Sequence, residues 1–378
     1  MNVVIAIDSF KGSLSSLQAG NAVKDAVLRL DKDADVFVKP LADGGEGTVD
    51  ALSSGFESDI VEITVKGPLL DPVVAKYCIL TETNTAVIEM AAASGITLIA
   101  PEDRNPLETS TYGVGEIIKD AIGRGVRRFI VGIGGSATND GGIGMLTALG
   151  YDFLDANGEP ISLGGKGLRD LCSIRTENVI PELYDCYFRV ACDVSNPLCG
   201  DNGCSAVYGP QKGATPEMIS EMDAWLEKYA AIARTVTDKA DKDYPGAGAA
   251  GGLGFAFVSF TNSKLESGIN IILQETNLEE FVKIADIVVT GEGRLDSQTV
   301  MGKAPIGVAK LAKKHGKKVI AFSGCVTEDA EICNEHGIDA FFPVLRGVTT
   351  LEEALDTKNA YNNLNATAYQ VFRLLMGE

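Results

Sequence analysis

A run of small and polar residues is the first feature of the sequence that could do chemistry. It reads GIGGSATNDGG, from position 132 to position 142. Glycine lets a backbone approach a ligand closely and adopt positive φ, while hydroxyl, amide and carboxylate side chains supply hydrogen bonds or a metal ligand. The run therefore predicts a loop that binds an anion or a metal–nucleotide, with an ordinary strand-to-helix turn as the alternative.

Three basic residues stand in other glycine-containing stretches, and carboxylates accompany them. Lys11 lies in DSFKGS, Lys212 in GPQKGA and Arg294 in GEGRLD. The accompanying carboxylates are Asp8, Asp43, Glu46, Asp140, Asp193, Glu292 and Asp296. Phosphoryl transfer needs cations to neutralise the phosphates, a carboxylate to hold Mg²⁺ and another group to take the hydroxyl proton. The set as a whole indicates this chemistry, while for any one carboxylate a solvated or turn-capping role is an equal alternative.

The composition excludes several other classes of protein. The 378 residues include 33 Lys and Arg against 52 Asp and Glu, a formal net charge of −19, which repels nucleic acids and anionic membrane surfaces. The eight cysteines lack zinc-ligand spacing, and no basic region of a signal peptide precedes the first apolar run. We therefore expect a cytoplasmic protein that binds small molecules, and neither nucleic acid nor membrane.

Known nucleotide-binding and catalytic motifs are weak or absent. Residues 132–137 fit G-x-G-x-x-A, with Asp152 about twenty residues further on, so a nicotinamide-dependent oxidoreductase is an alternative. Gly302 and Lys303 are followed by Ala304, where a Walker A motif has Ser or Thr. Both histidines precede a glycine at an expected helix end, which disfavours Ser-His-Asp catalysis.

Short apolar runs must position these loops. They span residues 3–7, 35–40, 285–290, 317–323 and 340–344, and near-continuous Val, Ile, Ala and Phe runs are typical of strands buried in a parallel sheet. The segment SSLQ, at 15–18, predicts the capping box of a helix after the first run. Ligand-binding loops of open α/β sheets gather at the carboxyl ends of the strands, so we expect DSFKGS, ADGGEG and GEGRLD at one edge.

The middle of the chain has a different pattern. Residues 59–80 read as two antiparallel segments around a Gly-Pro turn, 216–236 as a long amphipathic helix and 243–254 as a flexible, glycine-rich joint. We therefore expect a second α/β domain here. The predicted domains are residues 1–62 plus 281–378, which form one open α/β sheet, and the inserted residues 63–280.

Eight sequence blocks, in order, resemble the type 1 glycerate kinase family, and the resemblance runs nearly from end to end. The blocks are DSFKGSLS (8–15), PLADGGEGTVDAL (40–52), IEMAAASG (88–95), GIGGSATNDGGIGML (132–146), DVSNPLCG (193–200), GPQKGA (209–214), GAGAAGGLG (246–254) and VTGEGRLDSQTVMGKAPIGVA (289–309). Cys199 and Cys204 stand at positions where the family pattern is looser.

The resemblance implies ATP-dependent phosphorylation of D-glycerate with Mg²⁺, at the 2-hydroxyl, to give 2-phospho-D-glycerate and ADP. It also implies a Rossmann- or flavodoxin-like open parallel sheet domain, a second α/β domain inserted into it, and a cleft between them. A kinase for another short hydroxy acid, or one that forms 3-phosphoglycerate, is the alternative within this class. A nicotinamide-dependent oxidoreductase and a two-lobed solute-binding protein are the alternatives outside it.

The roles of individual residues are hypotheses based on their positions in glycine loops. Lys11 and Lys212 are expected to neutralise the triphosphate or the glycerate carboxylate, with Arg294 assisting. Asp193 is the candidate general base, and Asp43 and Asp296 are the candidate Mg²⁺ ligands. The other residues expected to bind substrate or nucleotide are Asp8, Ser9, Gly134, Gly135, Ser136, Thr138 and Asn139.

Overall fold

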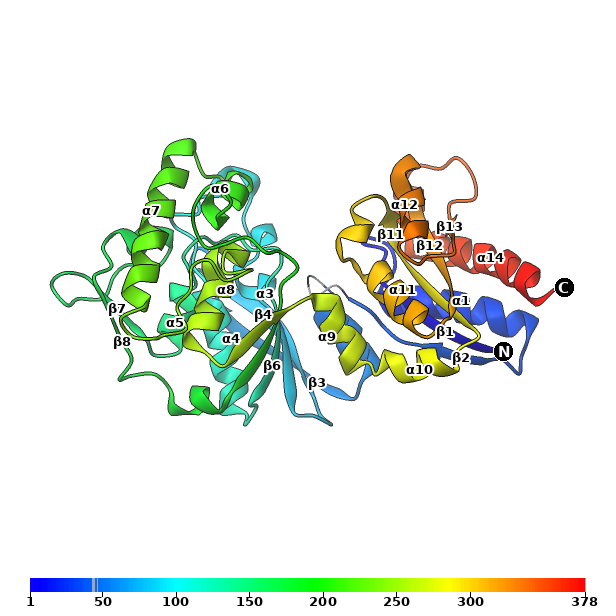
Figure 1. Cartoon of the computed structure of the whole chain (residues 1–378), viewed down its shortest axis with the longest axis horizontal. Coiled ribbons are helices and arrows are strands. Elements are labelled where there is room, and N and C mark those ends of the chain that lie inside the picture. Colours follow the sequence, from blue (N-terminus) through cyan, green and yellow to red (C-terminus); the bar gives the residue numbers. More distant parts are fainter. Residues whose placement is uncertain (43–44, 46, 378) are drawn as a thin grey trace. The chain divides into compact units, whose positions relative to one another are not determined.

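The computed structural model describes residues 1–42, 45 and 47–377, and the chain divides into two compact units (Figure 1). Unit 1 contains Met1–Asp43, Asp50–Phe56 and Ile269–Glu378, and unit 2 contains Gly44–Val49 and Glu57–Gly268. The predicted boundaries at 62/63 and 280/281 fall inside strand β3 (Ser58–Lys66) and helix α10 (Leu278–Ile284). The reason is that β3 pairs with β4 in unit 2, and α10 packs on α11 in unit 1.

Unit 1 is built on a sheet in the order β13-β12-β11-β1-β2, in which neighbouring strands are parallel. The strands are β1 (Asn2–Ile7), β2 (Asp35–Val38), β11 (Ile287–Leu295), β12 (Lys318–Val326) and β13 (Ala340–Pro343). This is the order of flavodoxin-like doubly wound folds, in which ligands bind outside the carboxyl ends of the strands where the order reverses. The expected open parallel sheet is confirmed, and its reversal point lies between β1 and β11.

Helices pack on this sheet and on one another (Figure 1). Helix α1 (Ser16–Leu30) packs against β1 and α14 (Thr357–Met376), while α11 (Ala304–Lys314) packs against β11 and β12. The predicted capping box at the start of α1 is confirmed, because Ser15 Oγ accepts from Gln18 N at 3.2 Å and Ser15 N donates to Gln18 Oε1 at 2.9 Å. This helix start sets the position of the loop between β1 and α1.

Unit 2 is built on a mixed sheet in the order β10-β9-β6-β5-β4-β3. Its further strands are β4 (Pro72–Leu80), β5 (Thr85–Glu89), β6 (Arg128–Gly132), β9 (Tyr187–Ala191) and β10 (Ser263–Glu266). The antiparallel pairing of β3 with β4 confirms the prediction for residues 59–80, whereas β5, β6, β9 and β10 are parallel. The parallel strands therefore share one carboxyl edge.

The described structure also contains further α-helices and a two-stranded antiparallel sheet, called the hairpin below, whose strands are joined by a long connection. The helices are α2 (Thr48–Gly55), α3 (Ala91–Ser94), α4 (Tyr112–Gly123), α5 (Ile143–Ala148), α6 (Cys204–Tyr208), α7 (Pro216–Ala233), α8 (Ala249–Phe260), α9 (Gly268–Glu275), α12 (Ile332–Glu335) and α13 (Leu351–Leu355), and the hairpin strands are β7 (Asp152–Leu154) and β8 (Ser173–Arg175). Helix α7 corresponds to the helix predicted at 216–236. In the described ranges, every helix is too short or too polar to cross a bilayer.

The glycine-rich segment at 243–254 is not the flexible joint that its composition predicts. Gly251 and Gly252 are buried and have φ of +67° and +92°. A Cβ on Gly251 would lie 2.0 Å from Thr138 O, and Gly141 N donates to Gly251 O at 2.9 Å. These glycines therefore allow two backbone segments to pack closely, and they support the loop that follows β6.

Candidate active site

The loop after β1 and the end of β11 form a cavity of about 310 Å³ in unit 1. The residues that line it are Asp8, Ser9, Lys11, Glu292, Gly293, Arg294 and Lys303. It lies where the strand order reverses, which is the usual ligand position of an open α/β sheet, and we name it the switch-point cavity. The structure thus brings together four predicted site residues, Asp8, Ser9, Lys11 and Arg294.

The segment GEGRL, which the sequence pattern assigns to a loop, instead continues β11 as far as Leu295. It pairs with β12, and Arg294 lies opposite Cys325. Gly291 permits this pairing, because a Cβ there would lie 2.1 Å from Phe322 O. The cavity residues of this segment are therefore held by a strand rather than by a free loop.

Basic side chains and carboxylates are interleaved at the switch-point cavity. Glu292 is buried, and its Oε1 accepts from Thr299 Oγ1 at 2.7 Å while its Oε2 lies 3.5 Å from Lys303 Nζ. Burial raises the pKa of Glu292, although Thr299 and Lys303 oppose the change. Asp296 lies 3.2 Å from Arg294 Nε and 3.8 Å from Lys303 Nζ. The cavity therefore offers several cations for phosphate oxygens and a nearby carboxylate for a metal.

The loop that follows β6 presents backbone amides at the carboxyl edge of the unit 2 sheet. Its start is held by hydrogen bonds from Ile96 N to Gly135 O at 2.8 Å and from Ala137 N to Ser94 O at 2.9 Å. Gly134 and Gly135 are exposed, and Gly135 has φ of +73°. Within the described residues, the amides of these two glycines donate to no acceptor. Successive free amides around a left-handed residue form a site for an anion.

Lys212 reaches this loop from the segment before α7, and its side chain is almost completely buried, with 2% exposure. Its Nζ donates to Ser136 Oγ at 2.8 Å and to Thr138 O at 2.7 Å. Burial lowers the pKa of Lys212 to about 8, while Cys204 and Asp140 oppose the change. In the part of the chain that the structure describes, no carboxylate lies within 4.0 Å of this ammonium group. We name Gly134, Gly135, Ser136 and Lys212 the anion cradle.

Asp140 anchors the other end of the same loop. Its buried carboxylate accepts from Thr111 N and Thr111 Oγ1, both at 2.8 Å, from Gly142 N at 3.0 Å and from Gly144 N at 3.3 Å. Burial raises the pKa of Asp140, and these donors oppose the change. Because all four bonds are internal, Asp140 holds the backbone of the loop in place.

Thr138 and Asn139, which were expected to bind substrate or nucleotide, are completely buried. Asn139 Nδ2 donates to Ser205 Oγ at 2.9 Å, and Thr138 contributes its carbonyl oxygen to Lys212. Among the described atoms, Thr138 Oγ1 and Asn139 Oδ1 have no hydrogen-bond partner. In this structure the two side chains are enclosed by protein, and the contact of this pair with the anion cradle is the backbone carbonyl of Thr138.

Asp193 follows β9, the strand that neighbours β6, so it lies at the same sheet edge as the anion cradle. Its side chain is exposed, and Oδ1 accepts from Gly268 N at 3.1 Å. A carboxylate in this position can take a proton from a hydroxyl bound at the edge. Asp43, one of the two predicted Mg²⁺ ligands, lies outside the described residues.

Glu292 and Lys303 are cavity residues that the predicted set omits. In the sequence, only the preceding glycine suggests a role for Lys303, and nothing distinguishes Glu292 from the carboxylates of the other glycine-containing stretches. In residues 1–42, 45 and 47–377, His, Cys, Asp and Glu form no group of three or more that could hold a metal. Mg²⁺ in phosphoryl-transfer sites usually has one or two carboxylates, with phosphates and water as its other ligands. Asp296 fits that donor set.

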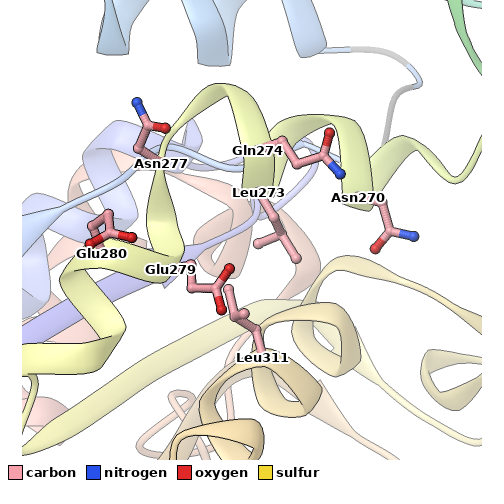
Figure 2. A pocket seen from close by; sticks show the side chains of 7 residues that line it. All are labelled: Asn270, Leu273, Gln274, Asn277, Glu279, Glu280 and Leu311. Carbon is pink, nitrogen blue, oxygen red and sulfur yellow. The ribbon is translucent and has the colours of Figure 1, made fainter.

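A second, slightly larger cavity of about 370 Å³ lies in unit 1 between α9, α10 and α11 (Figure 2). Its lining residues are Asn270, Leu273, Gln274, Asn277, Glu279, Glu280 and Leu311. None of these residues is basic, and Glu279 already pairs with Lys314 at 2.7 Å and with His315 at 2.8 Å. The lining therefore offers an anion no basic side chain of its own, whereas Lys11, Arg294 and Lys303 line the switch-point cavity. The switch-point cavity is the better site for an anionic substrate.

Comparison with known proteins identifies one family over nearly the whole chain. The family model described as the glycerate kinase family matches residues 3–376. Glycerate kinase of Haemophilus influenzae is 48% identical over 99% of each chain, and glycerate 2-kinase of Escherichia coli is 47% identical over 96% of this chain and 95% of its own. A crystal structure described as glycerate kinase 2 from Salmonella typhimurium is 46% identical, with a TM-score of 0.92 over 100% of this chain and 98% of its own.

Proposed function

The chain belongs to the glycerate kinase family, and we propose that it transfers the γ-phosphoryl group of ATP to the 2-hydroxyl of D-glycerate. It is an enzyme, a kinase whose substrates are glycerate and ATP. The 47% identity to a relative named glycerate 2-kinase supports the choice of hydroxyl. Because ATP is an intracellular substrate, we also propose that the reaction takes place in the cytoplasm.

The observation that carries the proposal is the composition of the switch-point cavity. Lys11, Arg294 and Lys303 line it at the reversal point of a flavodoxin-like sheet. Several cations in one place match a polyphosphate, because they neutralise its oxygens and the charge that develops on the leaving group. We propose that the ATP phosphates bind here, with Asp8 and Ser9 contributing polar contacts from the loop after β1.

The proposed step forms one P–O bond and breaks another. The 2-oxygen of glycerate attacks the γ-phosphorus, while the bond from this phosphorus to the β–γ bridging oxygen breaks and leaves ADP. Asp193 accepts the proton of the attacking hydroxyl, since it is an exposed carboxylate at the unit 2 edge. Such a base contributes about 10²–10⁴-fold to the rate.

Mg²⁺, when bound, neutralises charge on the transferring phosphates. Asp296 would hold it, because its carboxylate contacts Arg294 and Lys303, which line the switch-point cavity, and therefore lies next to the proposed phosphate site. Asp43 is proposed as the second ligand from its sequence position alone. Thr138 and Asn139 are proposed to position the loop after β6 rather than to contact a substrate.

The function is tested by ADP release from MgATP with D-glycerate, with L-glycerate and no-acceptor controls, and by ³¹P NMR of the product. We expect turnover only with D-glycerate and a phosphate on carbon 2. A phosphate on carbon 3 would keep the kinase but overturn the proposed acceptor. Absence of turnover by folded protein with any glycerate would overturn the proposed function itself.

A further inference from the structure

We propose that the anion cradle of unit 2 binds the carboxylate of the glycerate substrate, with Lys212 and Ser136 as its recognition groups. This inference rests on the proposed function and goes beyond it, because it assigns the acid to unit 2 and leaves the ATP phosphates to unit 1. It also makes Lys212 and Ser136 the residues that distinguish a hydroxy acid from a neutral polyol.

The first argument is that the ammonium group of Lys212 makes its hydrogen bonds to neutral groups. An ammonium group that is removed from water normally pairs with a carboxylate or another anion, because desolvation of a lone charge is costly. The side chain of Lys212 is 2% exposed, yet both groups that accept from it, Ser136 Oγ and Thr138 O, are neutral. The cradle is therefore suited to a ligand that brings one negative charge.

The second argument is the number of remaining donors. A lysine ammonium has three N–H groups, of which two are used by Ser136 Oγ and Thr138 O. Because Ser136 Oγ accepts from Lys212, its own hydroxyl proton is available for the ligand. Together with the exposed amides of Gly134 and Gly135, these groups can satisfy the two oxygens of one carboxylate.

The third argument is the contrast between the two sites. The cradle has a single cation, whereas Lys11, Arg294 and Lys303 all line the switch-point cavity. One cation matches a monocarboxylate, and three cations match a polyphosphate. The switch-point cavity also contains the carboxylates of Asp8 and Glu292, so the argument rests on the number of cationic donors and not on net charge. Three such donors favour the nucleotide phosphates in unit 1, and a single one favours the acid in unit 2.

The fourth argument is the position of the proposed base. Gly132, at the end of β6, lies beside Ala191, at the end of β9, and Asp193 follows two residues later. Neighbouring strands are about 4.8 Å apart, which is comparable to the length of a three-carbon acid. A glycerate whose carboxylate occupies the cradle can thus direct a hydroxyl toward the Asp193 side of the same edge.

The burial of Lys212 adds a pH signature that can be measured. Its pKa is lowered to about 8, and the titratable groups whose charge acts on it are Cys204 and Asp140. Burial raises the pKa of Cys204 to about 12, so this thiol keeps its proton between pH 7 and 9. A bound carboxylate stabilises the ammonium form, so binding above pH 8 takes up a proton and glycerate affinity falls as the pH rises.

The experiment is calorimetric titration of the whole protein with D-glycerate, in the presence of Mg²⁺ and saturating non-hydrolysable ATP analogue. Lys212→Met should weaken glycerate binding about 30-fold or more, and Ser136→Ala about 3–10-fold. Both variants should bind the ATP analogue like the wild type. Lys239→Met is the matched control, because Lys239 Nζ also donates to a backbone oxygen, Thr261 O at 3.3 Å, but near the amino end of β10.

Two further measurements isolate the charge. Glyceramide, which lacks the negative charge, should bind the wild type at least about 30-fold more weakly than glycerate, and Lys212→Met should abolish that preference. In buffers of different ionisation enthalpy, wild-type binding should take up more protons at pH 9 than at pH 7, because the pKa of Lys212 is lowered to about 8. Lys212→Met should show no such difference.

The outcomes separate the two proposals. If folded Lys212→Met keeps its affinity for glycerate and loses the ATP analogue, the cradle binds phosphate and the assignment is wrong. If it keeps both affinities, Lys212 is a structural residue and the assignment is also wrong. Failure of the proposed function is a different result, because the wild type itself would then bind and phosphorylate no glycerate.

Discussion

The contact between Gly251 and the loop after β6 makes a strong prediction for Gly251→Ala. A Cβ at this position would lie 2.0 Å from Thr138 O and 2.6 Å from Asn139 Cα. The first distance is roughly 1.5 Å shorter than an ordinary van der Waals contact, and both neighbours are backbone atoms that cannot rotate away. The loop must therefore move, and the carbonyl oxygen that holds Lys212 moves with it.

Gly251→Ala should lower both the stability of the protein and its activity. Alanine at φ of +67° is strained by about 1–2 kcal/mol, and overpacking of a close contact costs about 1–3 kcal/mol, so the free energy of unfolding should fall by about 2–5 kcal/mol. A displacement of about 1 Å at a binding group costs about 10²-fold in rate. We therefore expect kcat/KM for glycerate to fall by about that factor.

The assay is urea unfolding of the whole chain, together with steady-state kinetics on the folded variant. Gly200→Ala is the matched control, since Gly200 has φ of +91° and a Cβ there would meet nothing within 4 Å. The control should lose only about 1–2 kcal/mol and should keep full activity. If Gly251→Ala is as stable and as active as this control, the packing argument is refuted.

Three further substitutions test the roles proposed above. Asp193→Asn should lower kcat by about 10²–10⁴-fold, and a kcat equal to that of the wild type would exclude Asp193 as the base. Lys11→Ala should raise KM for ATP about 10-fold or more without changing the urea midpoint, because Lys11 is exposed; an unchanged KM would remove Lys11 from the nucleotide site. Thr299→Val should destabilise the protein by about 1.5–3 kcal/mol, because Glu292 loses its 2.7 Å hydroxyl donor, and Thr299→Ser should restore the loss. Equal stability of the Val and Ser variants would contradict that reasoning.

The parallel sheet of unit 1 could be predicted because strands that are buried on both faces appear in the sequence as near-continuous runs of apolar residues. The apolar runs at 3–7 and 285–290 contain most of β1 and the start of β11, and these strands pair with Ile5 opposite Val289. The capping box at Ser15 was equally visible, since it depends on residues only three positions apart. Once the strands are known, the edge that carries the loops follows from the topology.

Features that depend on distant partners could not be predicted. The glycines near 250 look like a flexible linker in the sequence. Glycine is found both where two backbones pack closely and where the chain is flexible, and the sequence does not distinguish the two cases. GEGRL looks like a loop until its pairing with β12 is known. The burial of Lys212 depends on Ser136 and Thr138, more than seventy positions away. The sequence therefore indicated a cation but not that its hydrogen-bond partners are neutral.

The insertion of unit 2 between β2 and β11 determines the order in which the two units can fold during synthesis on the ribosome. Strand β1 has its neighbour β11 far along the chain, with Val3 opposite Ile287. At a synthesis rate of about 5–20 residues per second, roughly 12–60 seconds pass between the synthesis of β1 and β2 and the synthesis of β11. The residues of unit 2 emerge during this interval as an almost continuous segment, Glu57–Gly268. Unit 2 can therefore fold first, while β1 has β2 as a neighbour but still lacks β11 on its other side.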